Sequence, residues 1–425
     1  MRLCLLCYRG NPRSGGQGVY LYHLARELAG LGHAVEVIVG NPWPRPLGRW
    51  ARVHKVHQRN LWGLYGGAAF QSPARGPRPL GLLSPGNLFD LAATRLRFFP
   101  EPFTFSLRAL FILAGIARRR TFAVIHDVQT LGYGIWAMKA FGAPVVTTVH
   151  HPLTVDLREA MLRAALLRDG VLHARYHAAA FYPITMQGRV IRRLARVITA
   201  SAAGRDAIAR DFRVPAERIS VVPNGIDLET FHAGEAVRRE PATLLFVGNT
   251  DDPRKGADVL LAALARLPES VRLRIVDEPY PARSHAPQSV ARLGLGGRVT
   301  FTGHLAAEDL AREYRRCTML VQPSRFEGFG LPAAEAMACG APVVAADAGA
   351  VAEVVPPEAG TLVPPADEAA LAEAIQALLD DPARRRAQSD FAPGFAAARF
   401  SWRLCAERVV EVYRGLEAGD LETGP

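Results

Sequence analysis

Short apolar runs alternate with amphipathic segments along most of the chain. The runs are bounded by glycine, proline or polar residues, as is typical of buried strands of a parallel sheet. The segments between them carry apolar residues at helical spacing, such as Leu21, Leu24 and Leu28. This pattern predicts repeated strand–helix units, and therefore an α/β fold. Strands are predicted at residues 1–8, 34–39, 121–126, 144–149, 197–200, 219–222, 243–247, 273–276, 299–301, 318–321 and 342–346, and helices at 257–267, 368–379 and 401–416.

Composition indicates a globular protein of several domains and argues against a disulfide framework and a membrane span. The chain has 425 residues, 49% of them hydrophobic, which is enough for two or three domains. Cys4 and Cys7 form a C-x-x-C within an apolar strand and are predicted to be core residues. Five cysteines imply no disulfide framework and fit a cytoplasmic protein. The opening apolar run is too short for a signal peptide, and the run at 103–117 contains Arg108 and is too short to span a bilayer.

The stretch Gln322–Ala350 is the most informative part of the sequence. A strand ends before Pro323, and the loop Glu327-Gly328-Phe329-Gly330 leads into a helix with Pro332 in its first turn. Gly340 is expected to end that helix in the left-handed conformation. Loop glycines let the backbone approach a ligand, and the N-terminus of the helix attracts phosphate.

Two carboxylates flank this loop, Glu327 and Glu335. We place Glu335 in the first helical turn, where the helix dipole alone could explain it. Carboxylates repel a diphosphate, so a sugar-nucleotide site would use them as acceptors for sugar hydroxyls. With seven residues between them, they resemble the E-x7-E signature of glycosyltransferase family 4, a large retaining group with the GT-B fold.

The resemblance implies a role for each residue of this stretch. Glu335 would bind the donor ribose and Glu327 the donor hexose. The backbone amides of Phe329, Gly330 and Leu331 would lie near hexose and phosphate, beside Gly328. A plain strand–helix connection remains the structural alternative.

Other segments also match the family. Gly15 and Gly16 would approach the donor diphosphate from the first domain, although a tight turn explains them as well. His150, after a strand, matches a histidine that contacts the hexose, whereas its neighbour His151 points to the opposite side. A structural histidine at the strand end is the alternative. Lys255 matches a lysine that neutralises the leaving diphosphate, and Arg254 precedes it. Asn249 stands where many members have an arginine that contacts phosphate, and Arg254 could make that contact instead.

The resemblance also predicts the architecture, GT-B: two Rossmann-like parallel-sheet domains that face a cleft. The turn Pro223-Asn224-Gly225-Ile226-Asp227 resembles the family's passage between domains. We predict an acceptor-side domain at 1–222, a donor domain at 223–398, and a tail at 399–425 that packs on the first domain.

These observations predict a metal-independent retaining hexosyltransferase that uses a nucleotide-diphosphate sugar. No D-x-D occurs in the chain, so we expect no metal and no other cofactor. The alternatives are a related epimerase or phosphorylase, and a sugar-nucleotide sensor without catalysis.

The acceptor is the least determined part. Residues 1–222 hold 30 Lys+Arg against 11 Asp+Glu, and residues 223–425 hold 21 against 29. The basic half shows no nucleic-acid motif, so we expect no nucleic-acid partner. The apolar segment 103–117 and the adjoining Arg118-Arg119-Arg120 suggest contact with the anionic inner face of a membrane and a lipid-linked or phosphorylated acceptor. A solvated basic surface and a small soluble acceptor are the alternatives.

Overall fold

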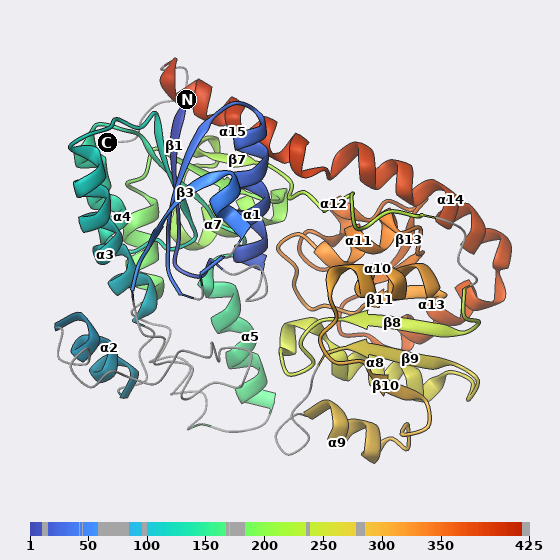
Figure 1. Ribbon diagram of the computed structural model, residues 1–425. Coiled ribbons are helices and arrows are strands. Elements are labelled where there is room, and N and C mark those ends of the chain that lie inside the picture. Colours follow the sequence, from blue (N-terminus) through green and yellow to red (C-terminus); the bar gives the residue numbers. More distant parts are fainter. Residues whose placement is uncertain are drawn as a thin grey trace. The chain divides into compact units, whose positions relative to one another are not determined.

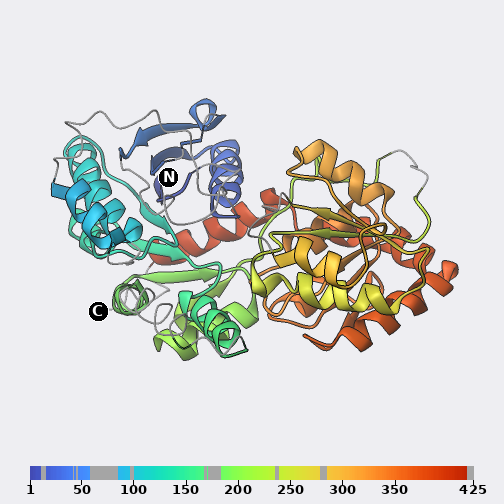
Figure 2. The ribbon, with the colours of Figure 1, turned by 90° about the horizontal axis from the view of Figure 1, so that it is seen from below.

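The computed structural model describes residues 1–10, 16–41, 43–44, 46–57, 85–95, 100–166, 170, 183–234, 239–277 and 285–418. The chain forms two compact units (Figure 1). The first contains residues 1–200, 204–222 and 405–425, and the second contains residues 201–203 and 223–404. Each unit is built on one parallel sheet, which confirms the predicted fold class. The end of the C-terminal helix α15 (Trp402–Glu417) belongs to the first unit (Figures 1 and 2).

The first sheet has seven strands in the order β3-β2-β1-β4-β5-β6-β7. Chain order reverses beside β1, so the loops after β1 and β4 lie at a topological switch point, where open α/β sheets bind ligands. The elements are β1 (Arg2–Cys7), α1 (Gly16–Gly30), β2 (Ala34–Val39), η2 (Pro46–Arg49), β3 (Ala51–Lys55), α2 (Pro85–Arg95), α3 (Glu101–Ala117), β4 (Val124–Val128), α4 (Tyr133–Ala137), η6 (Met138–Phe141), β5 (Val145–Thr148), α5 (Leu153–Leu166), β6 (Arg196–Thr199), α7 (Ala202–Phe212), η7 (Ala216–Arg218) and β7 (Ile219–Val221).

The second sheet has six strands in the order β10-β9-β8-β11-β12-β13, with its switch point between β8 and β11. The elements are β8 (Thr243–Val247), η8 (Pro253–Lys255), α8 (Ala257–Arg266), β9 (Arg272–Val276), α9 (His285–Arg292), β10 (Val299–Phe301), α10 (Ala307–Arg316), β11 (Met319–Gln322), α11 (Leu331–Ala338), β12 (Val343–Ala346), α12 (Val351–Val354), β13 (Gly360–Val363), α13 (Glu368–Asp380) and α14 (Pro382–Arg399).

Apolar strands buried on both faces explain this layering. In β8, Leu244 and Phe246 join a core with α8, α9 and α13. Leu245 lies between them in sequence and is also fully buried, so it must point to the opposite face. On that face α11 packs against α10 and α14. A strand buried on both sides reads as a continuous apolar run, which is why most central strands were predictable from sequence.

Helix α3, which covers the apolar segment at 103–117, has one buried face and one exposed face. In α3, Phe105, Ala109 and Leu113 are fully buried and pack in the core of the first unit, while Phe111 is 77% exposed. Arg196 begins strand β6 and is buried. In the described part of the chain, no helix combines the length and apolar character needed to cross a bilayer.

All five cysteines are buried, and the structure joins none of them in a disulfide. Cys4 and Cys7 lie in β1 with no exposed surface, so the prediction that they are core residues is confirmed.

Candidate active site

Two loops meet at the switch point of the second sheet. One follows β8 and contains Gly248, Asn249, Arg254 and Lys255. The other follows β11 and leads to α11. Because β8 and β11 are neighbouring parallel strands, both loops leave the same edge of the sheet.

The two loops are in close contact through Gly256 and Arg325. Gly256 has φ +67°, and a Cβ there would lie 2.0 Å from the carbonyl oxygen of Pro323. The Arg325 side chain donates to both carboxylate oxygens of Asp258, at 2.9 and 2.7 Å, and to the carbonyl of Pro253. The backbone N–H of Arg325 donates to the carbonyl of Arg254 at 2.7 Å. Glycine at 256 is therefore a requirement of loop packing.

Lys255 and Glu327 are joined across these loops. The Lys255 Nζ donates to Glu327 Oε1 at 2.7 Å, and the Ser324 hydroxyl donates to the same oxygen at 2.7 Å. Glu327 is only 8% exposed. Both contacts are on Oε1, so they orient the carboxylate while Oε2 takes part in neither. The structure thus brings together two residues that lie 72 positions apart and that the sequence placed in one site.

Asn249 and Arg254 each bond to a residue two positions away in the same loop. The Asn249 Oδ1 accepts from the N–H of Asp251 at 2.8 Å, forming a turn in the loop. The Arg254 guanidinium pairs with Asp252 at 2.6 Å, and the nearby positive charge holds the pKa of Asp252 below its usual value. Arg254 thus bonds within its own turn, and Lys255 contacts Glu327.

The helix α11 begins at Leu331, after Gly330 with φ +100°, and Gly340 follows its end with φ +76°. Pro332 is in the first turn, as predicted. Our placement of Glu335 in that turn is wrong, because the residue lies in the second turn. An attraction to the helix dipole, which acts within the first turn, therefore does not explain this carboxylate.

Tyr314 binds Glu335 instead. The Tyr314 hydroxyl is fully buried and donates to Glu335 Oε2 at 3.0 Å. Desolvation raises the pKa of Glu335 to about 7, the Tyr314 bond opposes that rise, and Asp227 adds to it. The protonation of Glu335 therefore changes near neutral pH.

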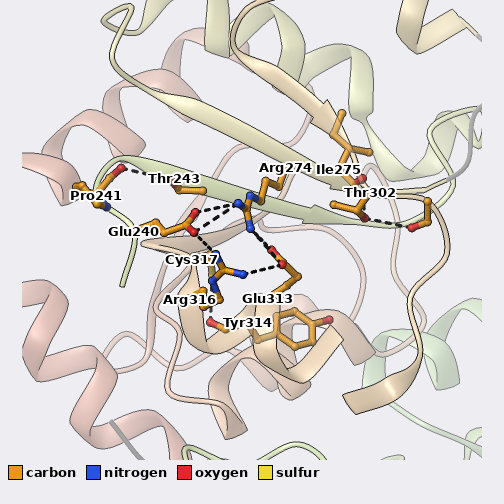
Figure 3. A network of polar contacts seen from close by, with 11 residues as sticks. Glu240, Pro241, Thr243, Arg274, Ile275, Thr302, Glu313, Tyr314, Arg316 and Cys317 are labelled. Atoms are coloured by element: carbon orange, nitrogen blue, oxygen red, sulfur yellow. Dashed lines mark hydrogen bonds and ion pairs between the residues drawn. The ribbon is translucent and has the colours of Figure 1, made fainter. Parts of the chain in front are cut away.

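Ion pairs fix the helix that carries Tyr314 (Figure 3). Arg274 on β9 lies between two carboxylates, at 2.8 Å from Glu313 and 3.2 Å from Glu240. Arg316 also pairs with Glu240. These contacts tie α10 to the sheet and so hold Tyr314 against α11.

In the first unit, His150 follows β5 beside the switch point. Gln129, which follows β4, holds its backbone: Gln129 Oε1 accepts from the N–H of His150 at 2.8 Å, and its Nε2 donates to the carbonyl of His151 at 2.7 Å. Gln129 does this with φ +52°, which is uncommon for a residue with a Cβ.

Burial lowers the pKa of His150 to about 3, and the neighbouring His151 adds to the effect, so the imidazole is neutral at neutral pH. Its Nε2 is buried without a hydrogen-bond partner among the described residues. His151 turns away and contacts Asp156 at 3.2 Å. Gly16 is the exposed first residue of α1, and Gly15 lies outside the described residues.

Sequence reasoning missed Tyr314, Ser324, Arg325 and Gln129. The loop residue Ser324 could have been suspected from its place three positions before Glu327. The others show no local signal, because their partners lie on different elements. Among the residues that the structure describes, no group of three His, Cys, Asp or Glu side chains is arranged to hold a metal ion.

Comparison with known proteins shows where this architecture belongs. The model of a family described as "Glycosyltransferase Family 4" matches residues 73–230, and that of a family described as "Glycosyl transferases group 1" matches residues 241–381. The MMP α-(1→4)-mannosyltransferase of Mycolicibacterium hassiacum is 40% identical over 417 residues, covering 97% of this chain and 98% of that protein. The chain belongs to glycosyltransferase family 4.

Other glycosyltransferases match over the full length. The glycogen synthase of Mycobacterium tuberculosis is 28% identical over 438 residues, covering 100% of this chain and 97% of its own. Sucrose-phosphate synthase from Thermosynechococcus elongatus superposes with a TM-score of 0.75 at 25% identity, covering 98% of this chain and 99% of that one. HepE of Anabaena, solved with UDP-glucose, has the same fold, with a TM-score of 0.66 at 20% identity, covering 98% and 100%. The protein is therefore a glycosyltransferase enzyme, as predicted.

Proposed function

We propose that this glycosyltransferase transfers a hexosyl group from a nucleotide-diphosphate sugar to an acceptor hydroxyl, with retention of configuration and without a metal ion. The observation that carries the proposal is the Lys255–Glu327 pair at the switch point of the second sheet. The Lys255 ammonium group is in direct contact with the oriented Glu327 carboxylate. Helix α11 begins in the same loop that carries Glu327. This set suits a diphosphate joined to a polyhydroxylated ring.

The chemistry divides between these groups. The bond between the hexose C1 and the phosphate oxygen breaks, and negative charge develops on the departing diphosphate. Lys255 and the α11 amides stabilise that charge, the work that a metal ion does in other transferases. The acceptor hydroxyl attacks C1 on the face that the phosphate leaves, and its proton passes to the departing phosphate oxygen. No protein nucleophile is required.

Three side chains would hold the donor. Glu327 Oε2 accepts from hexose hydroxyls while Oε1 is fixed by Lys255 and Ser324. Glu335, fixed by Tyr314, accepts from ribose hydroxyls. His150 contributes a neutral imidazole, and its Nε2, which has no hydrogen-bond partner among the described residues, bonds a hexose hydroxyl. Gly15 and Gly16 are proposed to approach the diphosphate.

Mannose is the first hexose to test, because the relative at 40% identity is named as an α-(1→4)-mannosyltransferase. That name also makes a mannoside 4-hydroxyl the first acceptor to test. HepE, which has this fold, was solved with UDP-glucose, so the fold can hold a nucleotide sugar.

A lipid-linked or phosphorylated acceptor remains a second proposal. Several arginines of the first unit already have partners: Arg9 binds Glu101, Arg108 binds Asp90 and Arg120 binds Glu36. This proposal is supported by three exposed side chains, Phe111 within helix α3 and Arg118 and Arg119 just after it. Sedimentation with anionic and neutral vesicles, at low and high salt, tests it. Failure to sediment under any condition would favour a soluble acceptor.

A donor panel tests the main proposal. UDP-, GDP- and ADP-linked mannose and glucose are scored by thermal shift, and the best binder is assayed for turnover with and without a mannoside acceptor. The proposal expects one donor to raise the melting temperature and to be consumed faster with acceptor. Binding without any turnover, including hydrolysis, would indicate a sensor.

A further inference from the structure

A buried chain of hydroxyl and imidazole groups connects the C-terminal helix to the strand that ends next to His150. The Tyr413 hydroxyl on α15 lies 2.5 Å from His126 Nδ1, and His126 Nε2 lies 2.7 Å from Thr148 Oγ1. The Tyr20 hydroxyl on α1 lies 3.0 Å from the same Thr148 oxygen. All four residues belong to the first unit.

These groups are closed off from water. Tyr413 and His126 have no exposed surface, and Thr148 and Tyr20 are 1% and 2% exposed. Burial lowers the pKa of His126 to about 3, so its imidazole is neutral. A neutral imidazole donates from one nitrogen and accepts at the other, which suits a position between two hydroxyls. Each bond that is removed leaves a buried group unpaired, so the chain is rigid as a unit.

Tyr20 brings this chain to His150. Its ring meets the His150 ring edge-on, with centroids 4.9 Å apart and planes at 78°. The same Tyr20 side chain thus contacts both Thr148, through its hydroxyl, and His150, through its ring. The backbone of His150 is held by Gln129, and its ring is held by a tyrosine whose hydroxyl is fixed at the end of the chain.

We propose that Tyr413 and His126 are positioning residues for His150, acting through Thr148 and Tyr20. This inference rests on the proposed role of His150 at the donor hexose. Packing alone would be served by apolar side chains between α15 and the sheet, without four buried polar groups that each need a partner. The polar chain instead fixes one geometry, and that geometry ends at the His150 ring.

A double-mutant cycle tests the proposal. Tyr413→Phe removes only the hydroxyl, and His150→Ala removes the ring that the chain is inferred to hold. We expect Tyr413→Phe to lower kcat about tenfold and His150→Ala about a hundredfold or more, with the donor KM of Tyr413→Phe within about twofold of wild type. In the His150→Ala background, Tyr413→Phe should slow turnover no further. Tyr133→Phe, which removes a hydroxyl that accepts from the exposed Arg189 at 3.2 Å, is the matched control and should be neutral.

The possible results separate a positioning role of Tyr413 from an independent or purely structural role. Equal slowing by Tyr413→Phe in both backgrounds would show that it acts independently of His150 and would overturn the positioning role. A lower melting temperature with unchanged kcat would show a purely structural role, with the same consequence. A normal kcat for His150→Ala would remove the role of His150 at the donor hexose and this inference with it, while the Lys255–Glu327 pair that carries the proposed function would be untouched. If Tyr413→Phe does not fold, Thr148→Val breaks the same chain and is run through the same cycle.

Discussion

Replacing Glu335 with glutamine should change how stability depends on pH. Desolvation raises the pKa of Glu335 from 4.5 to about 7. The folded protein therefore holds this proton more tightly than the unfolded chain. The stability that protonated Glu335 contributes is complete below about pH 4.5 and is lost as pH rises to about 7. A rise of this size corresponds to roughly 3 kcal/mol in full, most of which is lost between about pH 5 and 8. Glutamine is neutral at every pH, so the free energy of unfolding of Glu335→Gln should not show this loss.

The assay is equilibrium urea unfolding of wild type and Glu335→Gln at several pH values between about 5 and 8. The free energy of unfolding of the variant, minus that of wild type, should increase by roughly 2–3 kcal/mol over that range. Glu368→Gln, at a half-exposed pair with Arg266, is the control and should show a difference below about 0.5 kcal/mol at every pH.

Tyr314→Phe gives a second check on the same carboxylate. The Tyr314 bond lowers the pKa of Glu335, so its removal should move the pH-dependent loss of stability to higher pH. A difference between wild type and Glu335→Gln that does not vary with pH would refute the reasoning. It would mean that Glu335 is ionised in the folded protein as readily as in the unfolded chain.

Three further predictions concern the same loops. Lys255→Ala should lower kcat/KM by an amount that corresponds to roughly 2–4 kcal/mol of lost transition-state stabilisation, while the protein stays folded. Arg266→Ala is the control, and near-normal turnover of Lys255→Ala would remove Lys255 from the site. Gly256→Ala should destabilise the protein by more than about 2 kcal/mol, because its Cβ would meet the Pro323 carbonyl, whereas Gly294→Ala, also at positive φ but in open space, should cost about 1 kcal/mol in thermal melts. EDTA should leave turnover unchanged, and rescue of a chelated enzyme by Mg²⁺ or Mn²⁺ would contradict the proposed role of Lys255.

Much of the fold could be predicted, because central strands buried on both faces are plain apolar runs. The strands at Ala34–Val39 and Thr243–Val247, both inside their sheets, were predicted to the residue. Among the described residues, the strands that were missed are β3 and β13, and both lie at the edges of their sheets. Edge strands bury less: β3 reads Ala-Arg-Val-His-Lys and keeps most of its residues partly exposed. No periodic signal is left in such a segment.

The site was predictable only where its chemistry is local. The Glu327 loop, the helix after it and Lys255 each carry a signal in a few adjacent residues. Glu335 was assigned to the wrong turn because the start of the helix depends on the left-handed Gly330, which the sequence does not fix to one residue. Tyr314 and Tyr413 reach their partners from helices distant in sequence, at positions that local reasoning assigns to the core.

The central claim is retaining transfer of a hexosyl group, and the anomeric configuration of the product tests it most directly. The enzyme is incubated with the α-linked nucleotide-diphosphate sugar selected by the donor panel and with a mannoside acceptor, in the presence of EDTA. NMR then reads the anomeric configuration of the new linkage from its one-bond C1–H1 coupling, which distinguishes α from β for a mannosyl as well as a glucosyl group. An α-linked product, formed by wild type and largely lost in Lys255→Ala, is the predicted result. A β-linked product would contradict the account.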